Sequence, residues 1–184
     1  MKAGEVRIIG GQWRRTKLLV LDKPGLRPTP DRVRETLFNW LGQDLSGWRC
    51  LDAFAGTGAL GLEAASRGAQ HVTLVEQDPA LVAQLKKQSQ HLQAANVQVV
   101  RGDGVAVLRQ AAVGSFDLIF LDPPFEGDLF EAALLAARQA VRPNGWIYLE
   151  APSAWSPEAL AEKGLTCHRH LKAGMVHAHL LCVA

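Results

Sequence analysis

From Trp48 to the end, short apolar runs alternate with longer stretches in which apolar residues recur at helical spacing. The short runs predict strands at residues 49–54, 71–75, 97–101 and 116–121. The stretches that follow them predict helices at 59–67, 79–95, 104–112 and 129–141. The second helix is marked by Asp78 as its N-cap and Pro79 at its first position. Strands and helices in this order form right-handed βαβ units, so the pattern predicts a parallel sheet.

The C-terminal part of the chain predicts a different pairing. A fifth strand at 146–150 follows the turn Pro143-Asn144-Gly145, and a short helix at 157–162 comes next. Two further apolar runs, 165–171 and 175–183, are joined by the turn Lys172-Ala173-Gly174 and predict an antiparallel hairpin. The expected fold class is therefore α/β and Rossmann-like, with a mostly parallel sheet that ends in this hairpin.

The first quarter of the chain has a different pattern. Two short strands at 6–9 and 18–21 flank a basic loop at 10–17. Residues 31–41 then predict a helix with Thr29 as its N-cap and Pro30 at its first position. We therefore divide the chain into an N-terminal extension, residues 1–47, and a main domain, residues 48–184.

The composition fits one globular domain. Of the 184 residues, 48% are hydrophobic and 21% are charged, which suffices for one core but is short for two domains. No apolar run approaches the about 20 residues of a membrane span, and the N-terminus has no apolar signal region, so we expect a cytoplasmic protein that does not bind membranes. The three cysteines are an odd number and argue for buried thiols rather than a disulfide framework.

The charge is unevenly distributed along the chain. Residues 1–49 carry 10 Lys or Arg against 5 acidic residues, a net +5, whereas the remainder carries 10 against 13, a net −3. A basic N-terminal quarter suits a nucleic acid partner, but a solvated basic face would have the same composition.

The first candidate site is the run from Asp52 to Gly61, between the first predicted strand and its helix. Gly56 to Gly61 matches the G-x-G-x-x-G fingerprint of dinucleotide sites, and Glu76 follows about 20 residues later, where it can accept ribose hydroxyls. Asp52 beside the glycines would repel a pyrophosphate but suits a cationic ligand without phosphates, and S-adenosylmethionine is such a ligand. The alternative is that the glycines only make a tight turn under a closely packed helix.

Further residues at the same sheet edge belong to this predicted cofactor site. Asp103 follows the third strand and can accept a hydrogen bond from an adenine amine, although it can equally be the N-cap of the next helix. We also assign Phe54 and Gly104 to the cofactor site, next to Asp52, Gly56, Gly58 and Glu76.

The second candidate site is Asp122-Pro123-Pro124-Phe125, directly after the apolar fourth strand. The two prolines hold an extended turn without backbone donors, so carbonyl oxygens can face a cavity beside the Asp122 carboxylate. Hydrogen bonds from a base NH2 group to Asp122 and the Pro123 carbonyl would orient the nitrogen lone pair toward a methyl donor. Phe125 can stack on the base. Elsewhere, such a tetrapeptide is usually only a turn.

The combined motifs resemble one family over nearly the whole chain. They are Arg7-Ile8-Ile9-Gly10-Gly11, Arg27-Pro28-Thr29, the run from Asp31 to Trp40, Asp52 to Gly61, and Asp122 to Phe125. With these motifs the chain resembles the bacterial 16S rRNA guanine-N2 methyltransferase family, RsmD. One departure is the loop from Trp13 to Lys17, where that family usually has a glycine between basic residues.

The resemblance implies a seven-stranded methyltransferase sheet, S-adenosylmethionine as cofactor, and methylation of the N2 amine of a guanine in 16S rRNA within the small ribosomal subunit. It assigns Asp52, Gly56, Gly58 and Glu76 to the cofactor, and Asp122, Pro123 and Phe125 to the amine. We expect a monomer without a metal. The residues expected to contact RNA are in the N-terminal extension: Arg7, Arg14, Arg15, Lys17, Arg27, Thr29, Arg32 and Arg34.

Three other functions remain open from the sequence. A DNA adenine or protein glutamine methyltransferase would share the Asp122 motif and differ mainly in the N-terminal motifs. An NAD-linked oxidoreductase would explain the glycines but leaves Asp52 and Asp122 without a role. A noncatalytic RNA-binding module could retain the pocket as a relic, although both sites are intact.

A group of histidines on the predicted hairpin suggests a possible metal site. One strand carries His168 and His170 and the other His177 and His179, with Cys167 and Cys182 nearby. We expect no metal there, since a solvent-facing or hydrogen-bonded hairpin edge explains these residues equally well.

Overall fold

The computed structural model describes residues 4–125 and 128–184, and these ranges contain nine strands and six helices. The first three residues of the predicted extension lie outside them. In chain order, the elements are β1 (Gly4–Arg7), β2 (Lys17–Val20), α1 (Asp31–Leu41), β3 (Arg49–Asp52), α2 (Ala59–Ser66), β4 (His71–Glu76), α3 (Pro79–His91), β5 (Val97–Arg101), α4 (Gly104–Gln110), β6 (Phe116–Leu121), α5 (Leu129–Ala140), β7 (Val141–Ala151), α6 (Pro157–Ala161), β8 (Leu165–Ala173) and β9 (Val176–Val183).

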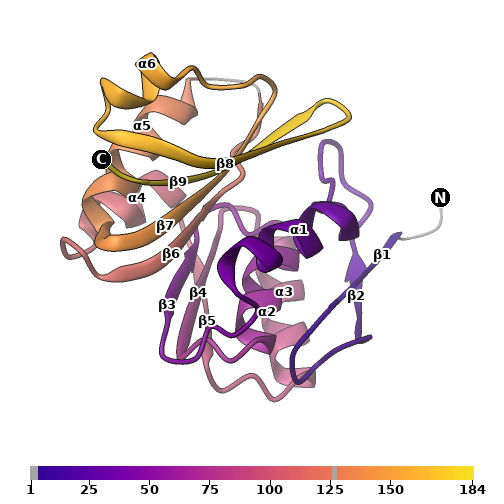
Figure 1. The fold of residues 1–184 in the computed structure, drawn as a ribbon. Helices are drawn as coiled ribbons and strands as arrows, with labels where there is room; N and C mark the ends of the chain where they lie inside the picture. Colours follow the sequence, from indigo (N-terminus) through magenta and orange to yellow (C-terminus); the bar gives the residue numbers. More distant parts are fainter. Residues whose placement is uncertain (1–3, 126–127) are drawn as a thin grey trace.

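Seven strands of the described chain form the larger sheet, in the order β5-β4-β3-β6-β7-β9-β8 (Figure 1). The first five in this order run parallel, and β9 pairs antiparallel with both β7 and β8. The prediction of a mostly parallel sheet with a terminal hairpin is confirmed. From β3, the chain adds strands first toward β5 and then, starting with β6, on the other side. At such a switch point, the carboxyl ends of the two central strands, here β3 and β6, flank a crevice where α/β proteins bind ligands.

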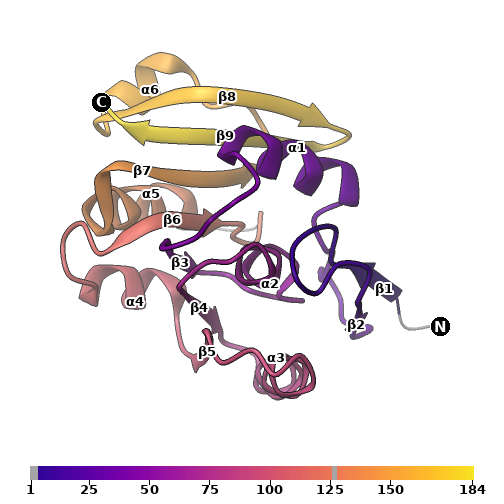
Figure 2. The same ribbon diagram turned by 60° about the horizontal axis from the view of Figure 1, so that its bottom comes forward.

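The sheet is covered on both faces (Figure 2). Helices α1, α2 and α3 lie on one face, and α4, α5 and α6 lie on the other. Each face has its own cluster of buried apolar side chains. Aromatic contacts join α1 to the sheet, since the ring centroids of Phe38 and Phe120 are 6.4 Å apart and those of Phe120 and Tyr148 are 6.2 Å apart. The extension thus contributes a helix to the core of the main sheet.

The other described part of the extension is a small sheet, in which β1 pairs antiparallel with β2. It lies beside α2 and α3 rather than on the larger sheet (Figure 2). The Gln88 side chain of α3 donates to the Leu19 carbonyl of β2 at 3.1 Å. Three residues that the sequence predicted at strand ends, Ile8, Ile9 and Leu21, are loop residues.

The start of α1 differs from its prediction. Pro30 itself occupies the N-cap position, with φ −57° and ψ 148°, and no side chain of the described residues caps the helix. Thr29 is not the cap, because its hydroxyl donates instead to Glu150, near the end of β7. The N-caps of α3 and α4 are as predicted, since Asp78 and Asp103 each accept hydrogen bonds from the first turn of their helix.

Strand β7 is longer than predicted. It begins at Val141, and its pairing with β6 shifts between Phe116 and Leu118, so the predicted turn at 143–145 lies in an irregular part of the strand. A bulge tolerates a proline because one residue there needs no ladder hydrogen bond. A glycine is needed at position 145, because a side-chain Cβ there would lie only 2.8 Å from the Asp117 carbonyl oxygen, which is too close. In the described ranges, no helix is both long and apolar enough to cross a membrane.

Candidate functional site

The glycine turn after β3 has the backbone that its sequence requires. Gly56 and Gly58 have φ angles of +53° and +80°, a region that side chains disfavour. Gly61 is needed for a different reason, since a Cβ there would lie 2.2 Å from Leu74 Cδ2. The turn therefore brings α2 close to the sheet, and its first two glycines supply a backbone conformation that other residues would strain.

Asp52 lies at the end of β3 under this turn and is 1% exposed. One carboxylate oxygen, Oδ2, accepts the Gly61 N–H at 3.0 Å, whereas Oδ1 is buried without a partner among the described residues. Burial raises the pKa of Asp52 to about 7. A buried carboxyl with a free oxygen has the chemistry to pair with a cationic ligand.

Glu76 ends β4 and connects the glycine turn to the next loop. Its Oε2 accepts the Gly56 N–H at 2.9 Å, and its Oε1 accepts the N–H groups of Gln77 and Asp78 at 2.8 and 2.9 Å. The carboxylate is partly exposed and a carboxylate can accept further hydrogen bonds. It can therefore receive ribose hydroxyls while it holds the turn.

Asp103 and Gly104 lie at the same edge of the sheet, after β5. Asp103 Oδ1 accepts the Ala106 N–H at 2.7 Å as a helix cap, and its Oδ2 accepts Gln77 Nε2 at 3.1 Å. Gly104 packs directly on β3, since a Cβ there would lie 2.0 Å from the Ala53 carbonyl oxygen. Phe54 is half-buried beside them. The structure thus brings the predicted cofactor residues to one edge, and their roles toward a ligand stay predictions.

The second predicted site follows β6 at the same edge. Pro123 is buried, Asp122 is half-buried, and Phe125 is 42% exposed, with its ring centroid 6.3 Å from that of Phe130. Burial raises the pKa of Asp122 well above its usual value, and the nearby carboxylates of Glu150 and Asp52 raise it further. Asp122 therefore lies within a group of three acidic side chains, each from a different strand end.

Glu150, the third acid of this group, was not identified from the sequence. It lies near the end of β7 and is 4% exposed. Its Oε1 accepts the Thr29 hydroxyl at 2.6 Å and the Tyr148 hydroxyl at 2.9 Å. The only local signal was a single acid at the end of an apolar strand, and its partner Thr29 is too distant in sequence to be inferred.

The segment between β2 and α1, residues 21–30, lies along this edge of the sheet and is called the connecting segment below. Lys23 forms an ion pair with Asp78, the N-cap of α3. Leu26 lies against the glycine turn, with its Cδ1 3.3 Å from the position of a Cβ at Gly56. Thr29 then reaches Glu150. The connecting segment thus contacts residues that follow β4 and β3, and then a residue near the end of β7.

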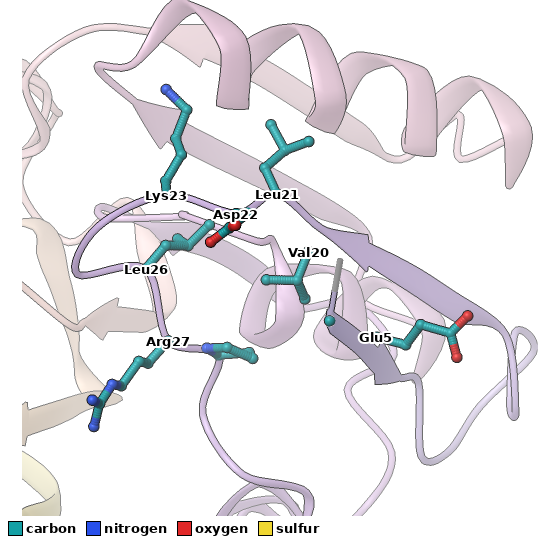
Figure 3. A pocket seen from close by; sticks show the side chains of 9 residues that line it. Glu5, Val20, Leu21, Asp22, Lys23, Leu26 and Arg27 are labelled. Carbon is teal, nitrogen blue, oxygen red and sulfur yellow. The ribbon is translucent and has the colours of Figure 1, made fainter. Parts of the chain in front are cut away.

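A hollow of about 270 Å³ lies between the connecting segment and the small sheet (Figure 3). Figure 3 shows Lys23 and Arg27 pointing away from the connecting segment in opposite directions. Lys23 is directed to its partner on α3, whereas Arg27 is exposed. Arg27 lines this hollow and is exposed, so its basic side chain is available to a partner outside the chain.

Most basic residues predicted to contact RNA are on the surface. The exposed ones are Arg7, Arg14, Arg15, Lys17, Arg27 and Arg32. Lys17 forms an ion pair with Glu5 at 2.9 Å, and both side chains are largely exposed. These positions remain compatible with binding a phosphate backbone.

Two of the predicted RNA contacts are wrong as surface contacts, because the structure buries them. Thr29 is 4% exposed and is bonded to Glu150. Arg34 is 0% exposed and pairs with Glu63 at 3.1 Å and with Asp31 at 2.6 Å. The Arg34 guanidinium also donates to the carbonyls of Arg7 and Thr29. Arg34 therefore holds the extension together rather than presenting charge to a partner.

The histidines of the hairpin make contacts with each other. His170 and His177 nitrogens are 2.9 Å apart, and His179 is buried, with Nε2 accepting the Trp155 N–H at 3.2 Å. Burial lowers the pKa of His179 to about 4. In the described ranges, no group of three or more His, Cys, Asp or Glu side chains is arranged to hold a metal ion. Of the three free cysteines, Cys50 is buried, whereas the other two are only half-buried.

Comparison with known proteins gives consistent matches over the whole chain. A family model described as "Conserved hypothetical protein 95" matches residues 6–182. Ribosomal RNA small subunit methyltransferase D from Escherichia coli K12 is 45% identical over 181 residues, which cover 95% of this chain and 88% of the relative. The protein of the same name from Haemophilus influenzae is 49% identical over 152 residues, covering 80% and 79%.

A solved structure supports the same relationship. An Escherichia coli protein, yhhF, provisionally described as a methyltransferase, superposes with a TM-score of 0.84 at 42% identity, covering 98% of each chain. The sheet order, the glycine turn and the Asp122 motif are all part of the region that these relatives share with the chain. The chain therefore belongs to the family of ribosomal RNA small subunit methyltransferase D, as its sequence motifs predicted.

Proposed function

We propose that this protein transfers a methyl group from S-adenosylmethionine to the exocyclic N2 amine of a guanine in 16S ribosomal RNA, within the small ribosomal subunit. The observation that carries the proposal is the position of Asp122 and Pro123, beside Asp52 at the crevice between β3 and β6, in a chain of this family. The proposal includes a monomer that acts in the cytoplasm.

The residues around the glycine turn fit the proposed cofactor. The free buried oxygen of Asp52 suits a cationic group, and Glu76 suits the ribose hydroxyls. Gly56 and Gly58 allow close approach of the ligand, and Asp103 is the candidate partner of the adenine amine. When bound, S-adenosylmethionine supplies an electrophilic methyl group on a positively charged sulfur.

The chain's own residues would prepare the amine for reaction. The lone pair of an exocyclic amine is delocalised into the base, so the nitrogen is a poor nucleophile until it is oriented. Asp122 and the Pro123 carbonyl would accept its two N–H groups, and Phe125 would stack on the flipped base. Asp122 would then receive the proton that leaves the nitrogen as its new bond to carbon forms.

The exposed arginines of the extension form the proposed RNA surface. Arg14 and Arg15 lie in the loop between β1 and β2, Arg27 in the connecting segment, and Arg32 on the outer side of α1. Side chains of this type bind phosphates and set the register of an RNA without reading its sequence. Residues 1–47 would thus dock the subunit, while residues 48–184 carry out the transfer.

The test is methylation of small ribosomal subunits with a labelled methyl donor, followed by mapping of the modified nucleotide. Asp122→Ala should bind S-adenosylhomocysteine as the wild type does but lose most of its single-turnover rate, by about 100-fold or more. Asp44→Ala, in an exposed loop, is the matched control and should keep full activity. Label on DNA adenine or protein glutamine instead of RNA, or near-normal turnover of Asp122→Ala, would refute the proposal.

A further inference from the structure

Glu150 is a buried acid that the proposed reaction does not yet use. Leu121 of β6 pairs with Leu149 of β7, so the residues that follow them, Asp122 and Glu150, lie at the same level of neighbouring strands. Both hydroxyl groups that contact Glu150, those of Thr29 and Tyr148, donate to its Oε1. Burying a carboxyl costs stability unless hydrogen bonds favour it, so a chain without a need for this charge would be more stable with an apolar residue there. Its place near the reacting amine suggests a function.

The groups around Glu150 determine whether its carboxyl is ionised or neutral. Burial raises the pKa of Glu150, and the hydrogen bonds from Thr29 and Tyr148 act against this by favouring its ionised form. Ala178 of β9 lies opposite Glu150 in the sheet and has no charge. On the helix side, the Arg34 guanidinium donates to the Thr29 carbonyl rather than to Glu150.

Arg34 does not neutralise Glu150, since its guanidinium is already paired with Glu63 and Asp31. The acidic neighbours are Asp122 and Asp52, from the ends of β6 and β3. Two hydroxyl donors favour the ionised form of Glu150, whereas no donor within the described chain contacts the Asp122 carboxyl. Of this pair, Asp122 is therefore the acid that binds a proton more readily.

We propose that Glu150 is a positioning residue: held by Thr29 of the connecting segment, it keeps a negative charge beside Asp122 and makes Asp122 a stronger acceptor of the amine proton. The inference rests on the proposed function of Asp122. In the step concerned, the amine nitrogen forms its bond to the methyl carbon as the carbon–sulfur bond of the donor breaks, and that electron pair stays on the sulfur, which becomes a neutral thioether. The amine proton moves to an Asp122 oxygen. The carboxylate becomes a neutral carboxyl, and the methylated amine leaves uncharged.

The role of Thr29 connects RNA docking to this chemistry. Thr29 is two residues from the exposed Arg27 and one residue before the N-cap of α1, so it belongs to the part of the extension that would face RNA. The extension thereby supplies a hydrogen bond to the catalytic edge in addition to basic charge.

The decisive experiment is Glu150→Gln, which keeps the shape and removes the charge. The titration of the Asp122 carboxyl, followed by NMR in protein labelled with 13C-aspartate, should move to lower pH by about one unit or more, because a nearby like charge has been lost. The acid limb of the single-turnover pH–rate profile should move down with it. The plateau rate should fall about three- to tenfold, because a weaker base accepts a proton less readily.

An Asp122 titration unchanged from wild type, or moved to higher pH, would overturn the inference. So would a lower plateau rate with an unmoved acid limb, which would indicate a purely structural role. The NMR titration needs no RNA substrate. A moved titration in a protein that methylates no ribosomal RNA would therefore refute the proposed function while leaving the Glu150–Asp122 coupling in place.

Thr29→Val provides the second test, because it removes only the hydroxyl that contacts Glu150. Glu150 should then bind a proton more easily, so the acid limb should move in the same direction as in Glu150→Gln but by less. Thr29→Ser should restore the wild-type profile. Thr36→Val is the matched control, since that hydroxyl donates to the Arg32 carbonyl on α1. Equal profiles for Thr29→Val and Thr36→Val would contradict the assigned role of Thr29.

Discussion

Replacing Glu63 with glutamine should detach the N-terminal extension from α2. Glu63 is 0% exposed and accepts four hydrogen bonds, from the N–H groups of Ile9 and Gly10 at 2.9 and 2.8 Å and from Arg34 and Arg67 at 3.1 and 2.9 Å. A glutamine side chain has the same shape but only one oxygen, and its NH2 group would face donors. Two arginines would then lose the anion between them.

The size of the effect follows from the burial of Arg34. With residue 63 neutral, the fully buried guanidinium of Arg34 keeps one charged partner, Asp31, whose side chain is 48% exposed. Removing one member of a buried ion pair costs about 3–5 kcal/mol. For a chain of 184 residues, each kcal/mol lowers Tm by about 2–4 °C, so Glu63→Gln should lower Tm by roughly 6–20 °C.

Thermal and urea unfolding would measure this change, and limited proteolysis would show whether the loop of residues 10–17 is cut first. Glu5→Gln is the matched control, because Glu5 pairs with Lys17 on the surface, with 54% and 63% of the side chains exposed. That exposed pair should contribute less than about 1 kcal/mol. If Glu63→Gln is as stable as Glu5→Gln, the buried network does not hold the extension, and the reasoning from burial is refuted.

Three further outcomes follow from the site. Glu76→Ala should weaken S-adenosylhomocysteine binding by about 1–3 kcal/mol in calorimetry, because it removes a charged acceptor, and unchanged affinity in a folded variant would exclude the ribose role. Since the pKa of Asp52 is about 7, affinity for the cationic S-adenosylmethionine should rise roughly tenfold between about pH 6 and about pH 8, as Asp52 loses its proton. Asp52→Asn should abolish this dependence, and a wild-type affinity that is flat with pH would disprove the pairing. Replacing Arg14 and Arg15 by Ala should reduce the salt dependence of subunit binding by about one unit of slope per lost phosphate contact. A wild-type slope in that double variant would remove the loop from the RNA surface.

The sheet could be predicted from the sequence because its information is local. Strand 116–121 is apolar except for Asp117 and buried throughout, as is typical of a central parallel strand. Asp78-Pro79 marks a helix start by the hydrogen bonds of its own first turn. Prediction was weakest at element ends. There, irregular pairing such as that at Gly145 depends on the neighbouring strand, which the local pattern does not contain.

The errors in the candidate site have the same cause. Thr29 before Pro30 has the local pattern of a helix cap, but its hydroxyl bonds to Glu150, which no local pattern predicts. Arg34 was assigned to RNA by its charge, although its spacing from Leu37 and Phe38 places it on the buried side of α1. Glu63 gave the complementary signal, as a single charge within an otherwise apolar helix. Arg34 and Glu63 are each a single charge on an apolar helix surface, and a buried charge is usually paired, so the two together would have suggested an ion pair.

The hydrogen bond between Thr29 and Glu150 joins two parts of the chain that are synthesised at different times. The two residues are 121 positions apart, so at about 5–20 residues per second Glu150 is synthesised roughly 6–24 seconds after Thr29. The β9 strand, which separates β7 from β8 in the sheet, is made later still. In a chain still emerging from the ribosome, the extension is therefore synthesised well before the sheet edge that it contacts, and the hydrogen bond that joins them can form only late in synthesis.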